Sequence, residues 1–137
     1  TKPAWKNYAK LVIKNAQALA SALQKLNYKI ISGGTDNHLM VVDLTNKNIS
    51  GKEAETRLAT AGLLVSRSTI PADPRPPYNP SGIRIGTPAI TTRGFKPADM
   101  KNLAQLIDNI LKTKDDRELK TRAQAVKKLT KKLTISK

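Results

Sequence analysis

Five prolines between residues 70 and 80 constrain this chain more than any other feature. They are Pro71, Pro74, Pro76, Pro77 and Pro80. Proline has no N–H group and a fixed φ, so this segment can form neither a helix nor a central strand. The strand-like run Ile83-Arg84-Ile85 follows almost at once. This spacing predicts an ordered surface loop that carries function, and not a linker between domains.

The chain before this loop predicts two helices and short strands. Apolar residues recur at helical spacing near the N-terminus, at Trp5, Tyr8, Val12, Ala16, Leu19 and Leu23. Ser50-Gly51-Lys52-Glu53 matches a helix capping box, and we expect that helix to end at Gly62. Strands are expected at Tyr28–Ser32, at His38–Leu44 with both faces covered, and at Leu63–Val65.

The chain after the loop predicts a strand and two more helices. Ile83–Ile85 is strand-like, and Pro97 suits the first position of a helix whose apolar side carries Met100, Leu103, Leu106, Ile107 and Ile110. A last helix would carry Leu119, Ala123, Val126 and Leu133. This order predicts an α/β fold, a small mixed sheet with helices packed on it.

Composition restricts the function classes. The 137 residues suffice for one domain, and the absence of Cys excludes disulfides and thiolate metal sites. With one His, the usual zinc clusters are excluded as well, and His38 is interpreted as structural. We expect no catalytic residue and no metal ligand in this chain. No apolar run reaches the length of a membrane span and no signal peptide is evident, so a cytoplasmic location is expected.

The formal charge of +15 is unevenly distributed. The segment from Lys112 to Lys137 holds ten Lys or Arg and three acidic residues. Such a segment is either a solvated helix face or an RNA-binding arm. We favour the solvated face because this segment has no aromatic residue on which a base could stack.

Arg84 is the candidate binding residue. It is the single charged residue in the run Ser81–Ala89, among small and apolar neighbours. An arginine buried in such a setting needs an anion, and its planar fork suits a carboxylate. A ligand carboxylate and a structural ion pair with an internal Asp or Glu are both consistent with this pattern.

Four motifs resemble those of the serine hydroxymethyltransferase family. They are Lys14–Ala20, Ser32–His38 with the strand ending in Val42-Asp43-Leu44, Gly51–Glu55, and Ser81–Ala89 continuing through Thr91 to Phe95. They occur in the family's order and spacing. The resemblance covers about residues 5 to 112, with a weaker likeness in the last helix.

The resemblance implies the aspartate-aminotransferase-like class, fold type I of the pyridoxal-phosphate enzymes. In that class a large domain holds the cofactor on a lysine, and a small C-terminal domain closes one side of the active site. Residues 1–137 would be this small domain alone. The implied enzyme interconverts serine plus tetrahydrofolate with glycine plus 5,10-methylenetetrahydrofolate. Because the chain begins at Thr1 and not at Met, a start codon, a processed segment or a whole domain is expected upstream.

The resemblance also implies site residues. Arg84 matches the arginine that binds the substrate carboxylate, and Pro76, Pro77 and Tyr78 match the folate-contacting loop. Two departures concern folate. Ser68 replaces the usual Asn, so a hydroxyl replaces an amide and folate contact is weakened or made through water. Pro76-Pro77-Tyr78 replaces Ser/Thr-Pro-Phe, and Tyr78 keeps an aromatic face.

No lysine of this chain stands in the Ser/Thr-rich, His-Lys setting of the family's Schiff base. The chain alone is therefore expected to be inactive, with pyridoxal phosphate held by the large domain. Its implied partners are serine or glycine, tetrahydrofolate, that large domain, and further copies in a homodimer or homotetramer. The alternative hypothesis is a non-catalytic, basic module associated with RNA or the ribosome.

Overall fold

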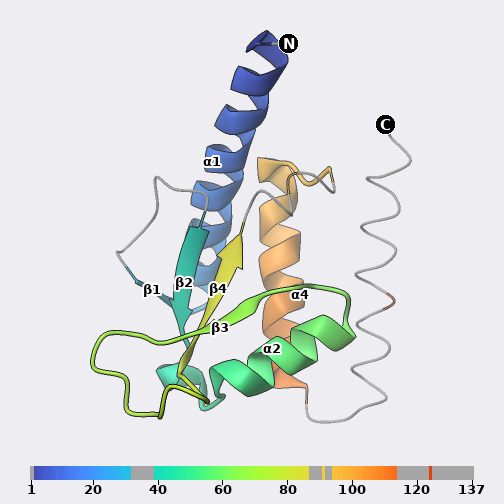
Figure 1. The fold of residues 1–137 in the computed structure, drawn as a ribbon. Helices are drawn as coiled ribbons and strands as arrows, with labels where there is room; N and C mark the ends of the chain where they lie inside the picture. The colour runs from blue at the N-terminus through green and yellow to red at the C-terminus, as the bar shows by residue number, and fades with distance from the viewer. Residues whose placement is uncertain (1, 32–38, 87–90, 92–93, 114–123, 125–137) are drawn as a thin grey trace.

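The computed structural model describes residues 2–31, 39–86, 91, 94–113 and 124. A four-stranded sheet has the order β1-β2-β4-β3. The strands are β1 (Lys29–Ile30), β2 (Leu39–Asp43), β3 (Ser66–Ser68) and β4 (Gly82–Gly86). The helices are α1 (Lys2–Lys25), α2 (Gly51–Thr60) and α4 (Met100–Lys112), with short 3-10 turns η1 (Thr45–Lys47) and η2 (Pro97–Asp99). Figure 1 shows the arrangement.

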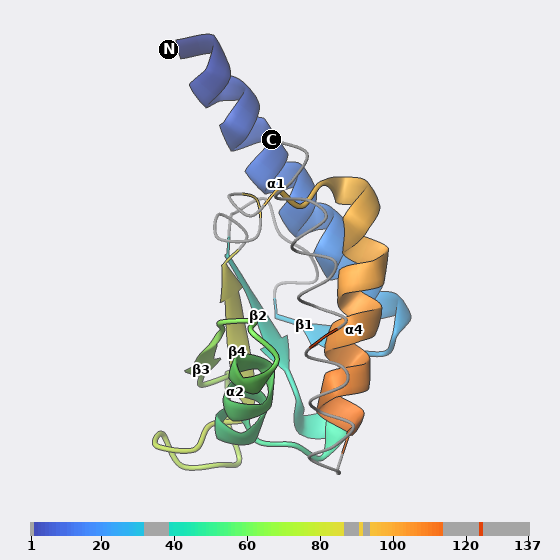
Figure 2. The same cartoon turned by 90° about the vertical axis from the view of Figure 1, so that its right-hand side faces the viewer.

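The helices form a layer against the sheet. Figure 2 shows α1 and α4 running together on one side of the strands, and α2 beside the β3 end. This arrangement confirms the predicted α/β layers. All three strand pairings are antiparallel, so the sheet is not mixed in the part that the structure describes.

The predicted apolar face of the first helix is confirmed at its described positions except Tyr8, which is half-buried. Val12, Ala16, Leu19 and Leu23 are all buried in α1. A buried polar residue lies among them: the Asn15 amide donates to Thr91 Oγ1 at 2.8 Å and to the Phe95 carbonyl oxygen at 2.9 Å. These bonds fix α1 to the chain that follows β4. The N-terminal turns of α1 project beyond the sheet (Figures 1 and 2).

The cap of the second helix is confirmed in part. Ser50 Oγ accepts the N–H of Glu53 at 3.1 Å, and Gly62 follows the helix at a positive φ of 88°. The Glu53 carboxylate pairs with Arg57 one turn later, at 2.8 Å, in place of the reciprocal bond of a capping box. The helix therefore begins and ends where the capping residues predict.

Two strand predictions are wrong. The strand predicted at Leu63–Val65 lies instead at Ser66–Ser68. Its position is determined by backbone pairing with β4, and not by the apolar side chains that precede it. The expectation that both faces of the His38–Leu44 strand are covered also fails. Met40 and Val42 are buried, whereas Val41 and Asp43 are only half-buried, so the helices cover one face. His38 lies outside the described residues.

The C-terminal helix prediction holds for α4. Pro97 opens the turn η2, and α4 follows with Met100, Leu103, Ile107 and Ile110 in the core. The predicted last helix lies almost wholly outside the described residues. Within those residues, no helix combines the length and the apolar character needed to cross a membrane.

Candidate functional site

Arg84 lies in the middle of β4 on the sheet face that the helices leave uncovered. Its neighbours Ile83 and Ile85 are buried, while Arg84 is exposed, as expected when side chains alternate between faces. Val41 and Ser66 flank Arg84 on the adjacent strands. Arg84 is therefore not buried in this chain, contrary to the prediction from its apolar neighbours. The three ion pairs between described residues do not include Arg84, which gives the structural ion pair no support.

Ser68 shares this face with Arg84. Residues paired across antiparallel strands point to the same side, so Ser66, opposite Arg84, and Ser68, opposite Gly82, face the same way. Ser68 is half-buried and its Oγ donates to the Thr69 carbonyl oxygen at 3.2 Å. The open face thus offers one guanidinium and two hydroxyls along the β3–β4 pair.

A proline-rich loop, residues 69–81, leaves this pair at Ser68 and returns at Gly82. The carboxylate of Asp73 lies at its centre. Asp73 Oδ1 accepts the Arg75 N–H at 2.8 Å and the Ser81 hydroxyl at 2.6 Å. Asp73 Oδ2 accepts the Ile70 N–H at 3.3 Å and the Ser81 N–H at 3.0 Å. One side chain therefore joins both ends of the loop.

The Asp73 network changes the acidity of its carboxyl group. Partial loss of water by itself raises the pKa of Asp73. The hydrogen bonds from Ser81, Arg75 and Ile70 outweigh that effect and lower the pKa from 3.8 to about 2. Asp73 is consequently an ionised, purely accepting group near neutral pH.

The base of the loop packs against the N-terminus of α2. The Gly51 N–H donates to the Pro80 carbonyl oxygen at 2.7 Å. A Cβ at Gly51 would overlap the Gly82 carbonyl oxygen, and a Cβ at Gly82 would lie 2.9 Å from Ile70 Cγ2. Two glycines thus permit a close approach of backbone segments that a side chain would prevent.

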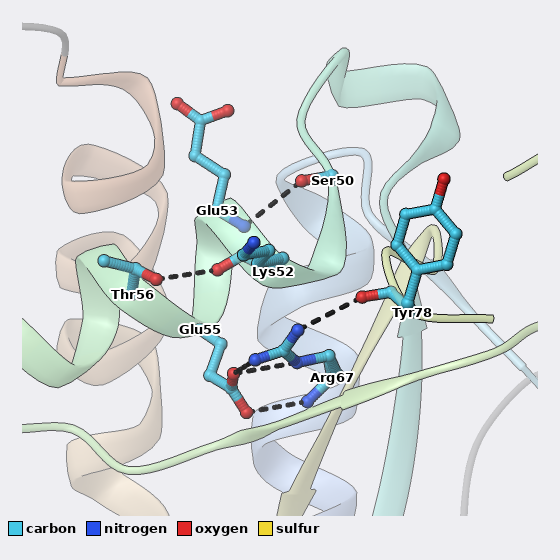
Figure 3. Close-up of polar contacts among 7 residues, drawn as sticks. All are labelled: Ser50, Lys52, Glu53, Glu55, Thr56, Arg67 and Tyr78. Carbon is cyan, nitrogen blue, oxygen red and sulfur yellow. Dashed lines mark hydrogen bonds and ion pairs between the residues drawn. The ribbon is translucent and has the colours of Figure 1, made fainter. Parts of the chain in front are cut away.

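Arg67 fixes the middle of the loop from β3. Its guanidinium pairs with Glu55 Oε1 of α2, with Nη2 at 2.9 Å and Nε at 3.0 Å. Nη1 donates to the Tyr78 carbonyl oxygen at 3.1 Å. Figure 3 shows Arg67 between Glu55 and Tyr78. This arginine therefore connects helix, strand and loop through one planar group.

The predicted folate-contacting residues lie on the outer part of this loop. Pro76 and Pro77 are exposed, and Tyr78 is 77% exposed. The structure thus brings Ser68 and the loop to the same strand pair as Arg84, and leaves the loop side chains open to solvent.

A second polar cluster lies away from this face. The buried Tyr28 hydroxyl donates to Asp108 Oδ1 at 2.7 Å, and Lys112 pairs with Asp108 Oδ2 at 2.9 Å. Burial and the Asp108 carboxylate raise the pKa of Tyr28 well above its ordinary 10.0. Lys47 lies over the Tyr28 ring at 4.4 Å from its centroid. This cluster stabilises the contact between α4 and the turn after α1.

The described residues do not fit a pyridoxal-phosphate site. Such a site needs a lysine amine held among groups that grip the phosphate and the ring. All described lysine side chains are exposed except Lys47, whose Nζ donates to the Leu26 carbonyl oxygen at 2.8 Å. In the same part of the chain, no group of three His, Cys, Asp or Glu residues could hold a metal.

Asp73, Arg67 and Glu55 were not predicted from the sequence as residues of this site. Asp73 had a signal, because Asp before Pro in a proline-rich segment favours a turn bonded to its own backbone. Glu55 and Arg67 are separated by a helix end and a strand start, and only the fold brings them together.

This site lies within a region of the chain that matches a known protein family. The model of the family Serine hydroxymethyltransferase matches residues 1–107 of the 137. The match includes α1, the whole sheet, the proline-rich loop, Arg84 and the first part of α4.

Proposed function

Because this chain belongs to the serine hydroxymethyltransferase family, we propose that it is the small domain of a pyridoxal-phosphate-dependent transferase. The enzyme moves the hydroxymethyl carbon of serine to tetrahydrofolate and leaves glycine. In this proposal the cofactor is held by residues of a large domain, and the present chain supplies contacts to both substrates. The subunits assemble as dimers or tetramers through contacts largely outside this chain.

The observation that carries the proposal is the exposed Arg84 on the uncovered face of the sheet. No described carboxylate pairs with its guanidinium. Two parallel N–H donors suit the carboxylate of serine or glycine. A large domain covering this face would exclude water and strengthen that contact.

Folate contact is assigned to Ser68, Pro76, Pro77 and Tyr78. The exposed ring of Tyr78 offers a flat surface for the pteridine, and the two prolines form a rigid apolar edge. The Ser68 hydroxyl donates to Thr69 but still accepts, so a pteridine N–H or a bridging water has a partner there.

Glycine binding to the full-length enzyme, measured by isothermal titration, tests the assignment of Arg84. Arg84→Gln should weaken binding by about 2–4 kcal/mol, or about 30- to 700-fold, because a charge-assisted bidentate contact is lost. Arg57→Gln removes the same charge from α2 and should leave the dissociation constant within about twofold. Equal affinities for Arg84→Gln and wild type would contradict the proposal.

A second candidate function rests on charge. The +15 net charge would attract RNA, and nearly half of the excess lies between Lys112 and Lys137. RNA binding measured against salt concentration tests this candidate. A steep linear fall of log K with log salt, with measurable binding at physiological salt, would support it. Loss of all binding at that salt would exclude it.

A further inference from the structure

We propose that Asp73 is a positioning residue, which holds the proline-rich loop in its ligand-binding shape before the ligand arrives. The inference rests on the proposed function, because the loop is taken to contact folate. It assigns to Asp73 the fixed placement of Pro76, Pro77 and Tyr78, and no contact with the ligand itself.

The hydrogen bonds of Asp73 are confined to the loop. Each carboxylate oxygen accepts two donors, and all four come from Ile70, Arg75 and Ser81. An ionised carboxylate offers about four acceptor positions, so this network occupies them all. Asp73 therefore acts on a ligand through the loop and not by touching it.

The outer part of the loop has little else to hold it. Residues 74–78 are all exposed, so apolar packing contributes little to their position. Besides Asp73, the outer part is held by the bond from the Asn79 N–H to the Pro76 carbonyl oxygen at 2.9 Å and by the Arg67 bond to the Tyr78 carbonyl oxygen. The Gly51 bond to Pro80 holds only the base of the loop. The shape of this loop thus depends on a few polar contacts, of which Asp73 makes four.

The backbone beside Asp73 is strained. Ala72 has a φ of 56°, in the left-handed region that alanine rarely adopts. Such a conformation persists only where neighbouring contacts determine it. The bonds from Asp73 to Ile70 on one side and Arg75 on the other enclose Ala72 and supply those contacts.

A loop that is already ordered binds with less loss of conformational freedom. Removing the Asp73 carboxylate should therefore weaken tetrahydrofolate binding. Binding of the amino acid, which Arg84 contacts on the strand, should not change. We expect Asp73→Ala to raise the dissociation constant of tetrahydrofolate about tenfold, since ordering of the loop must then accompany binding. Asp73→Asn keeps the side-chain volume and should give a smaller increase.

The test uses the full-length enzyme saturated with glycine and titrated with tetrahydrofolate. Asp99→Ala is the matched control, because Asp99 also caps a turn, through the Lys96 N–H at 2.8 Å, but at the start of α4. We expect Asp99→Ala to bind tetrahydrofolate normally, and all variants to bind glycine within about twofold of wild type.

A double-mutant cycle separates positioning from general stability. If Asp73 acts by placing Tyr78, then Tyr78→Ala should weaken tetrahydrofolate binding less in the Asp73→Ala background than in wild type. Amide hydrogen exchange in the present chain should also accelerate at Arg75 and Ser81 in Asp73→Ala.

Two results would overturn the inference. If Tyr78→Ala weakens tetrahydrofolate while Asp73→Ala does not, positioning by Asp73 is wrong and the proposed function stands. If amide hydrogen exchange accelerates in Asp73→Ala but the wild-type enzyme does not bind tetrahydrofolate, the assignment of the loop to folate is wrong. The role of Asp73 in folate binding is then wrong as well.

Discussion

Gly51→Ala should destabilise the fold, although alanine is the better helix former. Gly51 is the buried first residue of α2, and its N–H donates to the Pro80 carbonyl oxygen at 2.7 Å. A Cβ there would overlap the Gly82 carbonyl oxygen and lie 3.0 Å from that of Pro80. Both are backbone atoms at the base of the loop, so neither can rotate away.

The expected magnitude follows from three opposing effects. Helix propensity favours alanine over glycine by about 0.5–1 kcal/mol. Forcing a methyl group into a filled site costs about 1–3 kcal/mol, and weakening the bond to Pro80 costs about 1 kcal/mol. The net change for Gly51→Ala is a loss of about 1–3 kcal/mol in the free energy of unfolding.

Urea unfolding of the 137-residue chain, followed by far-ultraviolet circular dichroism, measures this change. Lys52→Ala, one residue further along α2 and exposed, is the control and should stay within about 0.5 kcal/mol of wild type. A Gly51→Ala protein as stable as wild type would refute the close packing of α2 on the loop.

Three further predictions concern stability. Tyr28→Phe leaves the buried Asp108 without its hydroxyl donor and should cost about 1–3 kcal/mol in urea unfolding, whereas Tyr78→Phe at an exposed position should be neutral. Folding lowers the pKa of Asp73 from 3.8 to about 2. The ionised carboxylate therefore stabilises the fold at any pH above the pKa of the unfolded chain, and this contribution disappears as pH falls through the pKa of the folded chain. The stability difference between wild type and Asp73→Asn should therefore be constant near neutral pH and shrink below about pH 4; a difference that grows in acid would contradict the Asp73 network. Ala72→Gly removes the strain of a positive φ, which stabilises the fold by about 1 kcal/mol, but it also raises the conformational entropy of the unfolded chain, which destabilises the fold by a similar amount. The free energy of unfolding should therefore change by less than about 1 kcal/mol.

Sequence patterns predicted the features that local chemistry determines. Ser50 and Gly62 mark the ends of α2 because a hydroxyl cap and a left-handed residue act within one turn. The prolines predicted an irregular surface loop for the same local reason. The apolar spacing of α1 predicted which of its residues enter the core.

The features that sequence missed depend on contacts between distant segments. Ser66–Ser68 is polar and short, and forms a strand only because the backbone of β4 lies beside it. The apolar run in β2 suggested burial on both faces, yet the helices cover one face and leave Val41 half-buried. The connection from Glu55 through Arg67 to Tyr78 likewise requires the folded sheet.

The placement of Arg84 by itself could be predicted in part. Its run of small and apolar neighbours indicated a strand, and β4 contains it as predicted. Its position on the other face from Ile83 and Ile85 also follows from alternation, because the two apolar side chains take the face that the helices cover. Alternation alone does not say whether another element covers the face of Arg84.

The most direct test of the account measures steady-state conversion of serine to glycine by the full-length enzyme, with and without tetrahydrofolate. We expect conversion that requires tetrahydrofolate, and a fall in kcat/KM for serine of at least about 30-fold in Arg84→Gln, corresponding to about 2 kcal/mol. Arg57→Gln should retain wild-type activity. Serine conversion that is independent of tetrahydrofolate, or equal in Arg84→Gln and wild type, would contradict it.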